Sequence, residues 1–108
     1  FLFADPANGW PAIDRQMLLD KLCVAMKPGA VLGLVDHAAD PDGDAAEVAK
    51  TLHRVDPKQV KDDFAQSCFT LEAEAEFLQN ADDDHTLSVF DPAIRGKTDR
   101  FVYRFIKE

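Results

Sequence analysis

The fold is decided by Lys27-Pro28-Gly29-Ala30-Val31-Leu32-Gly33-Leu34-Val35-Asp36-His37. Pro and Gly are typical of the end of a helix, and the run rich in Val and Leu that follows is typical of a buried β-strand. An acid and an imidazole stand where this apolar run stops. Because ligands of open α/β sheets bind beyond the carboxyl ends of the strands, Asp36 and His37 lie where substrate contact or chemistry is expected.

Periodicity and capping residues on both sides of this stretch predict an α/β fold. Helices are expected over residues 10–26, 44–52 and 56–67. Strands are expected over residues 30–36, 70–78 and 100–107. The first and the last of these strands are apolar on both faces, which predicts that other elements cover them on both sides.

Residues 70–78 alternate between small or apolar side chains and polar ones. The alternation predicts an edge strand, with one face formed by Leu71, Ala73, Ala75 and Phe77. Glutamates on the opposite face are expected to discourage pairing with another sheet edge. The aromatic strand over residues 100–107 is then expected in the centre of the sheet.

The connection over residues 79–99 has 21 residues, more than the ~12–15 that compact domains usually leave without regular structure. It is interpreted as a lid over a pocket or as a loop that an internal salt-bridge network orders, and the network is the favoured interpretation. The expected members of the network are Asp91, Arg95, Lys97 and Asp99. The acidic run Asp82-Asp83-Asp84 is expected to be solvated.

Composition restricts the partners and the compartment. The 108 residues suffice for one domain, and a formal net charge of -8 without a basic stripe argues against nucleic acid as a partner. No apolar run approaches the ~20 residues of a membrane-spanning helix. Cys23 and Cys68 form no recognised motif, and we expect free buried thiols, as in a reducing cytoplasm. The start at Phe1, without an initiator Met, favours a fragment of a longer chain.

Three motifs carry a resemblance to a known family. They are the Lys-Pro-Gly-strand-Asp-His run of residues 27–37, the run Leu52-His53-Arg54-Val55-Asp56, and the run Val89-Phe90-Asp91-Pro92-Ala93-Ile94-Arg95-Gly96-Lys97-Thr98-Asp99-Arg100-Phe101. Over nearly its whole length, the chain resembles the C-terminal half of a family of bacterial predicted class I S-adenosylmethionine-dependent methyltransferases. The motifs are specific for the family and say little about the substrate.

The resemblance implies a Rossmann-like methyltransferase sheet, of which residues 1–108 supply the last three strands, with the final strand antiparallel and central in a mixed sheet. It also implies methyl transfer to a small-molecule acceptor. The family holds its donor on a Gly-rich turn in the first half of the fold, and the glycines here form neither GxGxxG nor GxG. S-adenosylmethionine is therefore expected as the cofactor of the intact protein and not as a ligand of this chain alone, which is expected to be inactive by itself.

The candidate catalytic residues are Asp36 and His37, which position an acceptor or remove its proton, since imidazole titrates near neutrality. The alternative is that Asp36 caps the turn and His37 makes a local hydrogen bond. The candidate substrate-binding residues are Trp10, His53, Arg54 and Arg95. Trp10 stacks on a flat substrate or staples the following helix, and Arg54 clamps an anionic group or tethers a loop to the core.

Two other functions stay open. The apolar edge of the strand over residues 30–36 would pair with another chain, which indicates a non-catalytic binding or self-assembly module. A metal-dependent hydrolase or lyase would draw on His37, His53, His85 and the neighbouring aspartates. Their spacing matches no recognised metal site, so no metal is expected.

Overall fold

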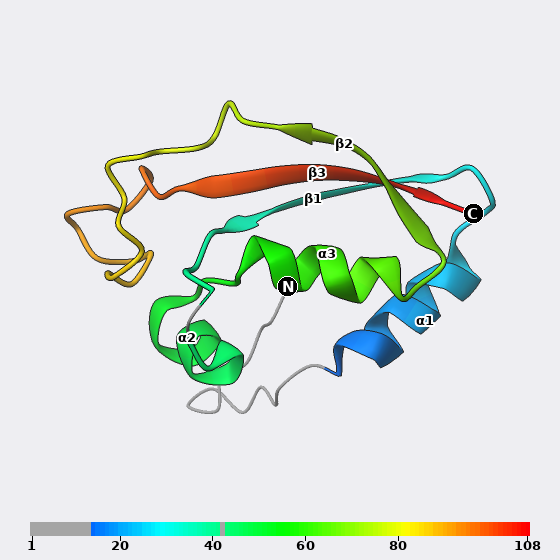
Figure 1. The fold of residues 1–108 in the computed structure, drawn as a ribbon, viewed down its shortest axis with the longest axis horizontal. Helices are drawn as coiled ribbons and strands as arrows, with labels where there is room; N and C mark the ends of the chain where they lie inside the picture. Colours follow the sequence, from blue (N-terminus) through cyan, green and yellow to red (C-terminus); the bar gives the residue numbers. More distant parts are fainter. Residues whose placement is uncertain (1–13, 42) are drawn as a thin grey trace.

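The computed structural model describes residues 14–41 and 43–108 (Figure 1). The helices and strands are α1 (Arg15–Ala25), β1 (Val31–His37), α2 (Ala45–Leu52), α3 (Pro57–Ala65), β2 (Phe69–Ala75) and β3 (Arg100–Lys107). They confirm the predicted α/β class, and the start of the first predicted helix lies outside the described residues. None of the described helices is long and apolar enough to cross a membrane.

Aspartate caps begin the described helices. The side chains of Asp14, Asp44 and Asp56 accept hydrogen bonds of 3.0, 3.0 and 2.9 Å from backbone N–H groups in the first turns. These bonds satisfy N–H groups that have no partner within the helix. At the other end of α2, His53 adopts a left-handed backbone (φ 56°, ψ 43°) and turns the chain back toward the sheet.

β3 lies between β1 and β2 and is antiparallel to both. Leu34 of β1 pairs with Tyr103 of β3, and Leu71 of β2 pairs with Phe105. The last strand of the chain therefore occupies the centre of the described sheet. This order confirms the one that was predicted from the sequence.

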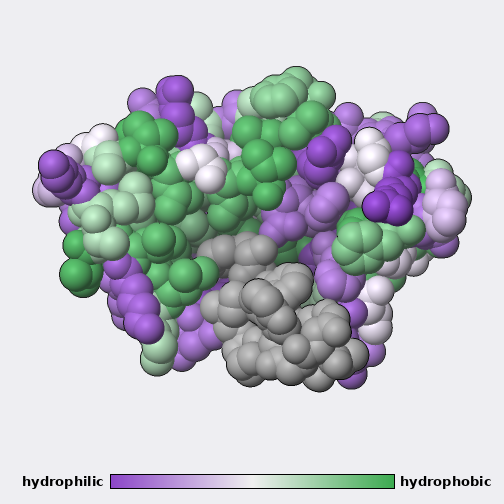
Figure 2. All heavy atoms as spheres, turned by 180° about the vertical axis from the view of Figure 1, so that it is seen from behind, coloured by the Kyte–Doolittle hydropathy of each residue, from purple (hydrophilic) through white to green (hydrophobic). Residues whose placement is uncertain are grey.

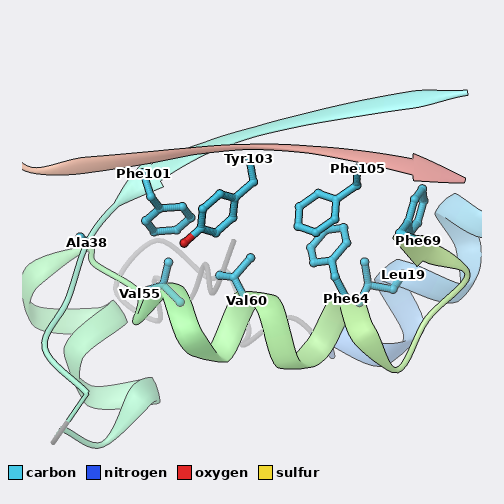
Figure 3. Close-up of a cluster of buried hydrophobic side chains, with 9 residues drawn as sticks. All are labelled: Leu19, Ala38, Val55, Val60, Phe64, Phe69, Phe101, Tyr103 and Phe105. Atoms are coloured by element: carbon cyan, nitrogen blue, oxygen red, sulfur yellow. The ribbon is translucent and has the colours of Figure 1, made fainter. Parts of the chain in front are cut away.

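The described helices cover one face of the sheet (Figure 1). Aromatic rings from β3 point toward α3, and Phe64 of α3 stacks on Phe105 with ring centroids 4.0 Å apart (Figure 3). Leu19 of α1 and Phe69 of β2 close the cluster at one end, and Phe101 lies near the other end (Figure 3). Burial of these side chains, each worth roughly 1.5–3 kcal/mol, holds α1 and α3 to the sheet.

The other face of β1 is not covered by described residues, contrary to the prediction. Val31 and Val35 are 56% and 54% exposed, because the described helices all pack on the opposite face. Hydrophobic side chains gather on the side of the molecule where β1 forms the sheet edge (Figure 2). Self-association through this edge stays a prediction.

A β-bulge in β2 overturns the strict alternation expected from the sequence. Leu71 lies opposite Phe105, whereas Ala73 lies opposite Arg104, so two steps along β2 match one step along β3. Because neighbouring residues of β3 point to opposite faces, Leu71 and Ala73 also do. The expected apolar face is therefore divided, and β2 ends before Phe77, which is 76% exposed.

The bulge places Glu74 opposite Tyr103, on the face that the helices cover. The Glu74 carboxylate forms an ion pair with Lys61 of α3, with 2.9 Å between Nζ and Oε1. The same ammonium group lies 5.1 Å from the centre of the Tyr103 ring. One of the glutamates that were expected to point to solvent thus joins β2 to α3.

The two cysteines form a disulfide, so the expectation of free thiols is wrong. Cys23 lies in α1 and Cys68 directly precedes β2, and their Cα atoms are 6.1 Å apart. A sequence separation of 45 residues gave no sign that the end of α1 meets the start of β2. The cytoplasmic compartment, which was inferred partly from free thiols, stays a prediction.

Loss of this disulfide is expected to destabilise the fold. The double variant Cys23→Ser with Cys68→Ser lowers the free energy of unfolding by about 4 kcal/mol, because the unfolded chain regains the entropy of an open 45-residue loop. Urea unfolding with and without dithiothreitol measures the effect. Dithiothreitol should shift the curve of the wild-type chain and leave that of the double variant unchanged. Identical wild-type curves under both conditions would contradict the pairing.

Candidate functional site

The tip of β1 places Asp36 and His37 on opposite faces of the sheet. Asp36 pairs with Phe101 on the face that the helices cover, and His37 pairs with Arg100 on the other face. The Asp36 carboxylate accepts a 2.7 Å hydrogen bond from the backbone N–H of His37. The two candidate catalytic residues are therefore adjacent through the backbone, and their side chains diverge.

The imidazole of His37 is held by Thr98, a buried residue near the end of the long loop. The distance between Nδ1 of His37 and Oγ1 of Thr98 is 2.7 Å. Burial lowers the pKa of His37 below its usual 6.5, and the charges of Arg100 and Arg54 lower it further against the opposing effect of Asp36. His37 is therefore neutral near pH 7 and is able to accept a proton.

Arg54 is turned into the protein, where it tethers the long loop to the sheet. Its guanidinium binds both oxygens of Asp83 at 2.8 and 2.9 Å, and both side chains are almost completely buried. It also donates to the backbone carbonyls of Leu87 and Ala38, each at 3.0 Å. This geometry corresponds to the alternative that the sequence left open for Arg54, a tether from a loop to the core.

His85 joins the loop to two other parts of the chain. Its Nδ1 lies 2.7 Å from a carboxylate oxygen of Asp40, and its Nε2 lies 2.8 Å from one of Asp99. Burial lowers the pKa of His85, but the hydrogen bonds to Asp99 and Asp40 outweigh burial, so the pKa lies above the usual 6.5. The protonated imidazole is thus favoured as a bridge between these two carboxylates.

These contacts confirm that polar interactions order the long loop, but the members of the network differ from those expected. Of the expected members, Asp99 takes part in an ion pair, whereas Arg95 and Lys97 lie exposed in the turn before Thr98. Asp83 was expected in solvent and is only 6% exposed. Asp83 is buried because it binds the guanidinium of Arg54, which lies in the core. The two residues are 29 positions apart in the sequence, so the contact could not be predicted from local patterns.

The remaining candidate residues that the structure describes, His53 and Arg95, do not converge on the tip of β1. His53 ends α2, and its ring contacts Phe90 edge-on, with centroids 4.9 Å apart. Arg95 lies exposed in the long loop. Trp10 lies outside the described residues. The structure thus brings His37 together with Thr98 and Arg100, two residues that the sequence did not assign to a site.

A cavity of about 280 Å³ lies between the ends of the strands and the start of α3. Its lining residues are Ala38, Pro57, Glu74, Ala75, Glu76, Gln79, Asp99, Arg100, Phe101 and Tyr103. Sequence reasoning missed this cavity because its walls come from four separate segments. One feature of the sequence pointed to this region, since Ala38 directly follows the polar residues at the end of β1.

Within residues 14–41 and 43–108, no group of three or more His, Cys, Asp or Glu side chains is arranged to hold a metal ion. Comparison of the chain with protein-family models, curated proteins and solved structures finds no match.

Removal of the buried carboxylate is expected to be strongly destabilising. Asp83→Ala leaves the Arg54 guanidinium buried without its counterion and lowers the free energy of unfolding by about 3–5 kcal/mol. Urea unfolding measures the loss. The matched control is Asp62→Ala, which breaks the exposed pair with Lys58 and should leave stability nearly unchanged. If the two substitutions lowered the free energy of unfolding equally, burial would not be the reason for the contribution of the Asp83 contact to stability.

His85 and His37 are expected to make the stability of the fold depend on pH in opposite directions. Stability from His85 is complete below pH 6.5 and is lost as the pH rises through its raised folded-state pKa. Stability from the neutral His37 is complete above pH 6.5 and is lost as the pH falls through its lowered pKa. NMR titration of the ring protons gives both pKa values, and urea unfolding at several pH values gives the stability.

Variants separate the two contributions. His85→Gln should abolish the decline in stability above pH 6.5, and His37→Gln should reduce the decline below it. A His85 that titrates below His37 would be incompatible with the bridge to Asp40 and Asp99.

Proposed function

We propose that these residues form the acceptor side of a class I S-adenosylmethionine-dependent methyltransferase that acts on a small molecule. The observation that carries the proposal is the strand order β1-β3-β2 with β3 antiparallel to both neighbours. The family resemblance implies this arrangement for the last three strands of the sheet. The polar residues Asp36 and His37 at the tip of β1 support an acceptor site there, because ligands of open α/β sheets bind beyond the carboxyl ends of the strands.

In this proposal His37 takes the proton of the acceptor. Burial lowers the pKa of the imidazole, so a ring nitrogen is free to accept a proton near pH 7. Thr98 fixes the orientation of the ring through Nδ1, and Asp36 fixes the backbone of His37. Because methyl transfer depends largely on alignment, loss of His37 is expected to slow the reaction without preventing binding.

The residues of this sequence do not fit the methyl donor. The glycines of this sequence form neither GxGxxG nor GxG, and a Gly-rich turn of this kind is the part of the family fold that admits the donor. The proposal therefore gives these residues three tasks, which are to bind the acceptor, to orient it and to accept its proton. It assigns donor binding to residues outside this sequence.

The test uses the complete natural reading frame that contains these residues. With S-adenosylmethionine labelled in its methyl group and a size-filtered cell extract as the acceptor pool, label should enter the small-molecule fraction. His37→Ala should lower the rate of transfer about 10²-fold, because a general base is removed, and should leave the affinity for S-adenosylhomocysteine unchanged. Lys58→Ala, at an exposed position of α3, is the control and should change neither quantity.

If the protein encoded by the complete reading frame binds no S-adenosylhomocysteine in calorimetry, the proposal is contradicted.

The second candidate function is a self-assembly module, which the exposed Val31 and Val35 at the edge of the described sheet favour. Light scattering of the same sample distinguishes it, since a stable dimer without donor binding is expected for the module.

A further inference from the structure

The first residue of β3 is an arginine whose charge is not paired within the described part of the chain. Arg100 lies directly opposite His37 of β1, so the two side chains share the face of the sheet that the described helices leave uncovered (Figure 1). Among the described residues, the Arg100 side chain takes part in no hydrogen bond or ion pair, and its Nε is buried. Arg104, which lies further along β3 on the same face, is paired with Glu72 at 3.0 Å. The two arginines of this face therefore differ in that Arg104 has a counterion.

A buried N–H group without a partner costs free energy, so a structure that keeps one calls for an explanation. The Arg100 side chain is only partly buried, and Nε is its one nitrogen that is both buried and without a partner. The terminal nitrogens of the guanidinium are therefore open to a ligand. A carboxylate is the group that suits them best, because it accepts two parallel hydrogen bonds from a guanidinium.

The acids that neighbour Arg100 and His37 in the sequence do not neutralise this guanidinium. Asp36 points to the opposite face of the sheet, where its partner in the strand register is Phe101. The Asp99 carboxylate binds the ring of His85. The imidazole of His37 is neutral near pH 7, because burial and the charge of Arg100 itself lower its pKa. An anion that approaches Arg100 on the uncovered face thus meets one unneutralised cation and a neutral base.

An apolar surface adjoins Arg100 and His37 on the same face. The next pair of side chains on this face is Val35 with Val102, and Ala75 of β2 pairs with Val102 from the other side. Val35 is 54% exposed, so this surface is accessible to a ligand. The arrangement suits a molecule with a carboxylate at one end and an apolar body at the other.

We propose that this face binds a small carboxylic acid, with its carboxylate on Arg100 and its apolar body on Val35 and Val102. Side chains directly opposite each other in an antiparallel pair have Cβ atoms ~4.5–5.5 Å apart, so the carboxylate is held beside His37. A hydroxyl or amino group next to the carboxylate is then within reach of the imidazole, and this names the acceptor as an acid that carries such a group. As a statement about the methyl acceptor the inference rests on the proposed function, and as a statement about binding it rests on the geometry of this face.

The test is a titration of the 108-residue chain, followed in NMR by the backbone amides and the ring protons of His37. The probes are benzoate, phenylacetate and cyclohexanecarboxylate. At least one of these acids should bind saturably and shift the amides of Val35 and Val102 and the ring signals of His37. Benzyl alcohol lacks the charge of benzoate and acetate lacks its apolar body, so each should bind about tenfold more weakly than benzoate.

Matched variants assign the two parts of the site. Arg100→Gln should weaken binding of benzoate about tenfold, and Arg100→Lys, which keeps the charge without the planar fork, should weaken it less. The control is Arg104→Gln, which removes the paired cation of the same face and should have a negligible effect. Val35→Ala should weaken benzoate about threefold and leave acetate unchanged. Its control is Val24→Ala, at a position of α1 that is 89% exposed.

The inference is overturned if none of the acids binds saturably, if benzyl alcohol binds as tightly as benzoate, or if the folded Arg100→Gln variant binds benzoate as the wild type does. Inorganic phosphate is titrated alongside, and binding as tight as that of benzoate would overturn the assignment to a carboxylic acid with an apolar body. The titration contains no methyl donor, so its failure leaves the methyltransferase proposal standing. Conversely, binding of benzoate without any methyl transfer by the complete reading frame would retain the carboxylate site and remove only its role in holding the acceptor.

Discussion

The buried ion pair between Arg54 and Asp83 is the constraint on which the architecture beside the sheet depends. Two charges removed from water are tolerated only if their hydrogen bonds are satisfied. The Asp83 oxygens accept bonds from the guanidinium and from the backbone N–H groups of His85 and Asp99. The guanidinium also holds the carbonyl of Ala38, just beyond β1. One pair thus joins the tip of β1, the middle of the long loop and the start of β3.

This pair explains how a long connection keeps one conformation without helix or strand. Asp99, whose backbone N–H binds Asp83, uses its own carboxylate to hold His85 and the N–H group of Asn80. His85 then reaches Asp40 on the opposite loop. Each of these hydrogen bonds depends on a residue that the preceding bond holds in position. Loss of the pair between Arg54 and Asp83 is therefore expected to release the contacts of Asp99 and His85 as well.

The part of the fold that local chemistry determines was predicted from the sequence. Aspartate caps, the Lys-Pro-Gly turn and the apolar runs gave the elements, and the alternation of residues 70–78 identified an edge strand. Contacts between distant residues were not predicted. The disulfide between Cys23 and Cys68 and the pair between Arg54 and Asp83 depend on how the elements pack, and the bulge in β2 reverses the face of Glu74 without any break in the alternation.

The same limits apply to the candidate site. His37 was identified from the sequence because it ends an apolar strand. That Thr98 and Arg100 are its neighbours follows only from the pairing of β3 with β1. The alternation of side chains along β3 separates two features of the site. Arg100 lies opposite His37 of β1, whereas its neighbour Phe101 points to the face that the helices cover and lines the cavity beside α3 (Figure 3). Because β3 lies between β1 and β2, its side chains contact the surroundings of His37 on one face of the sheet and the cavity on the other, and neither contact could be predicted before the strand order was known.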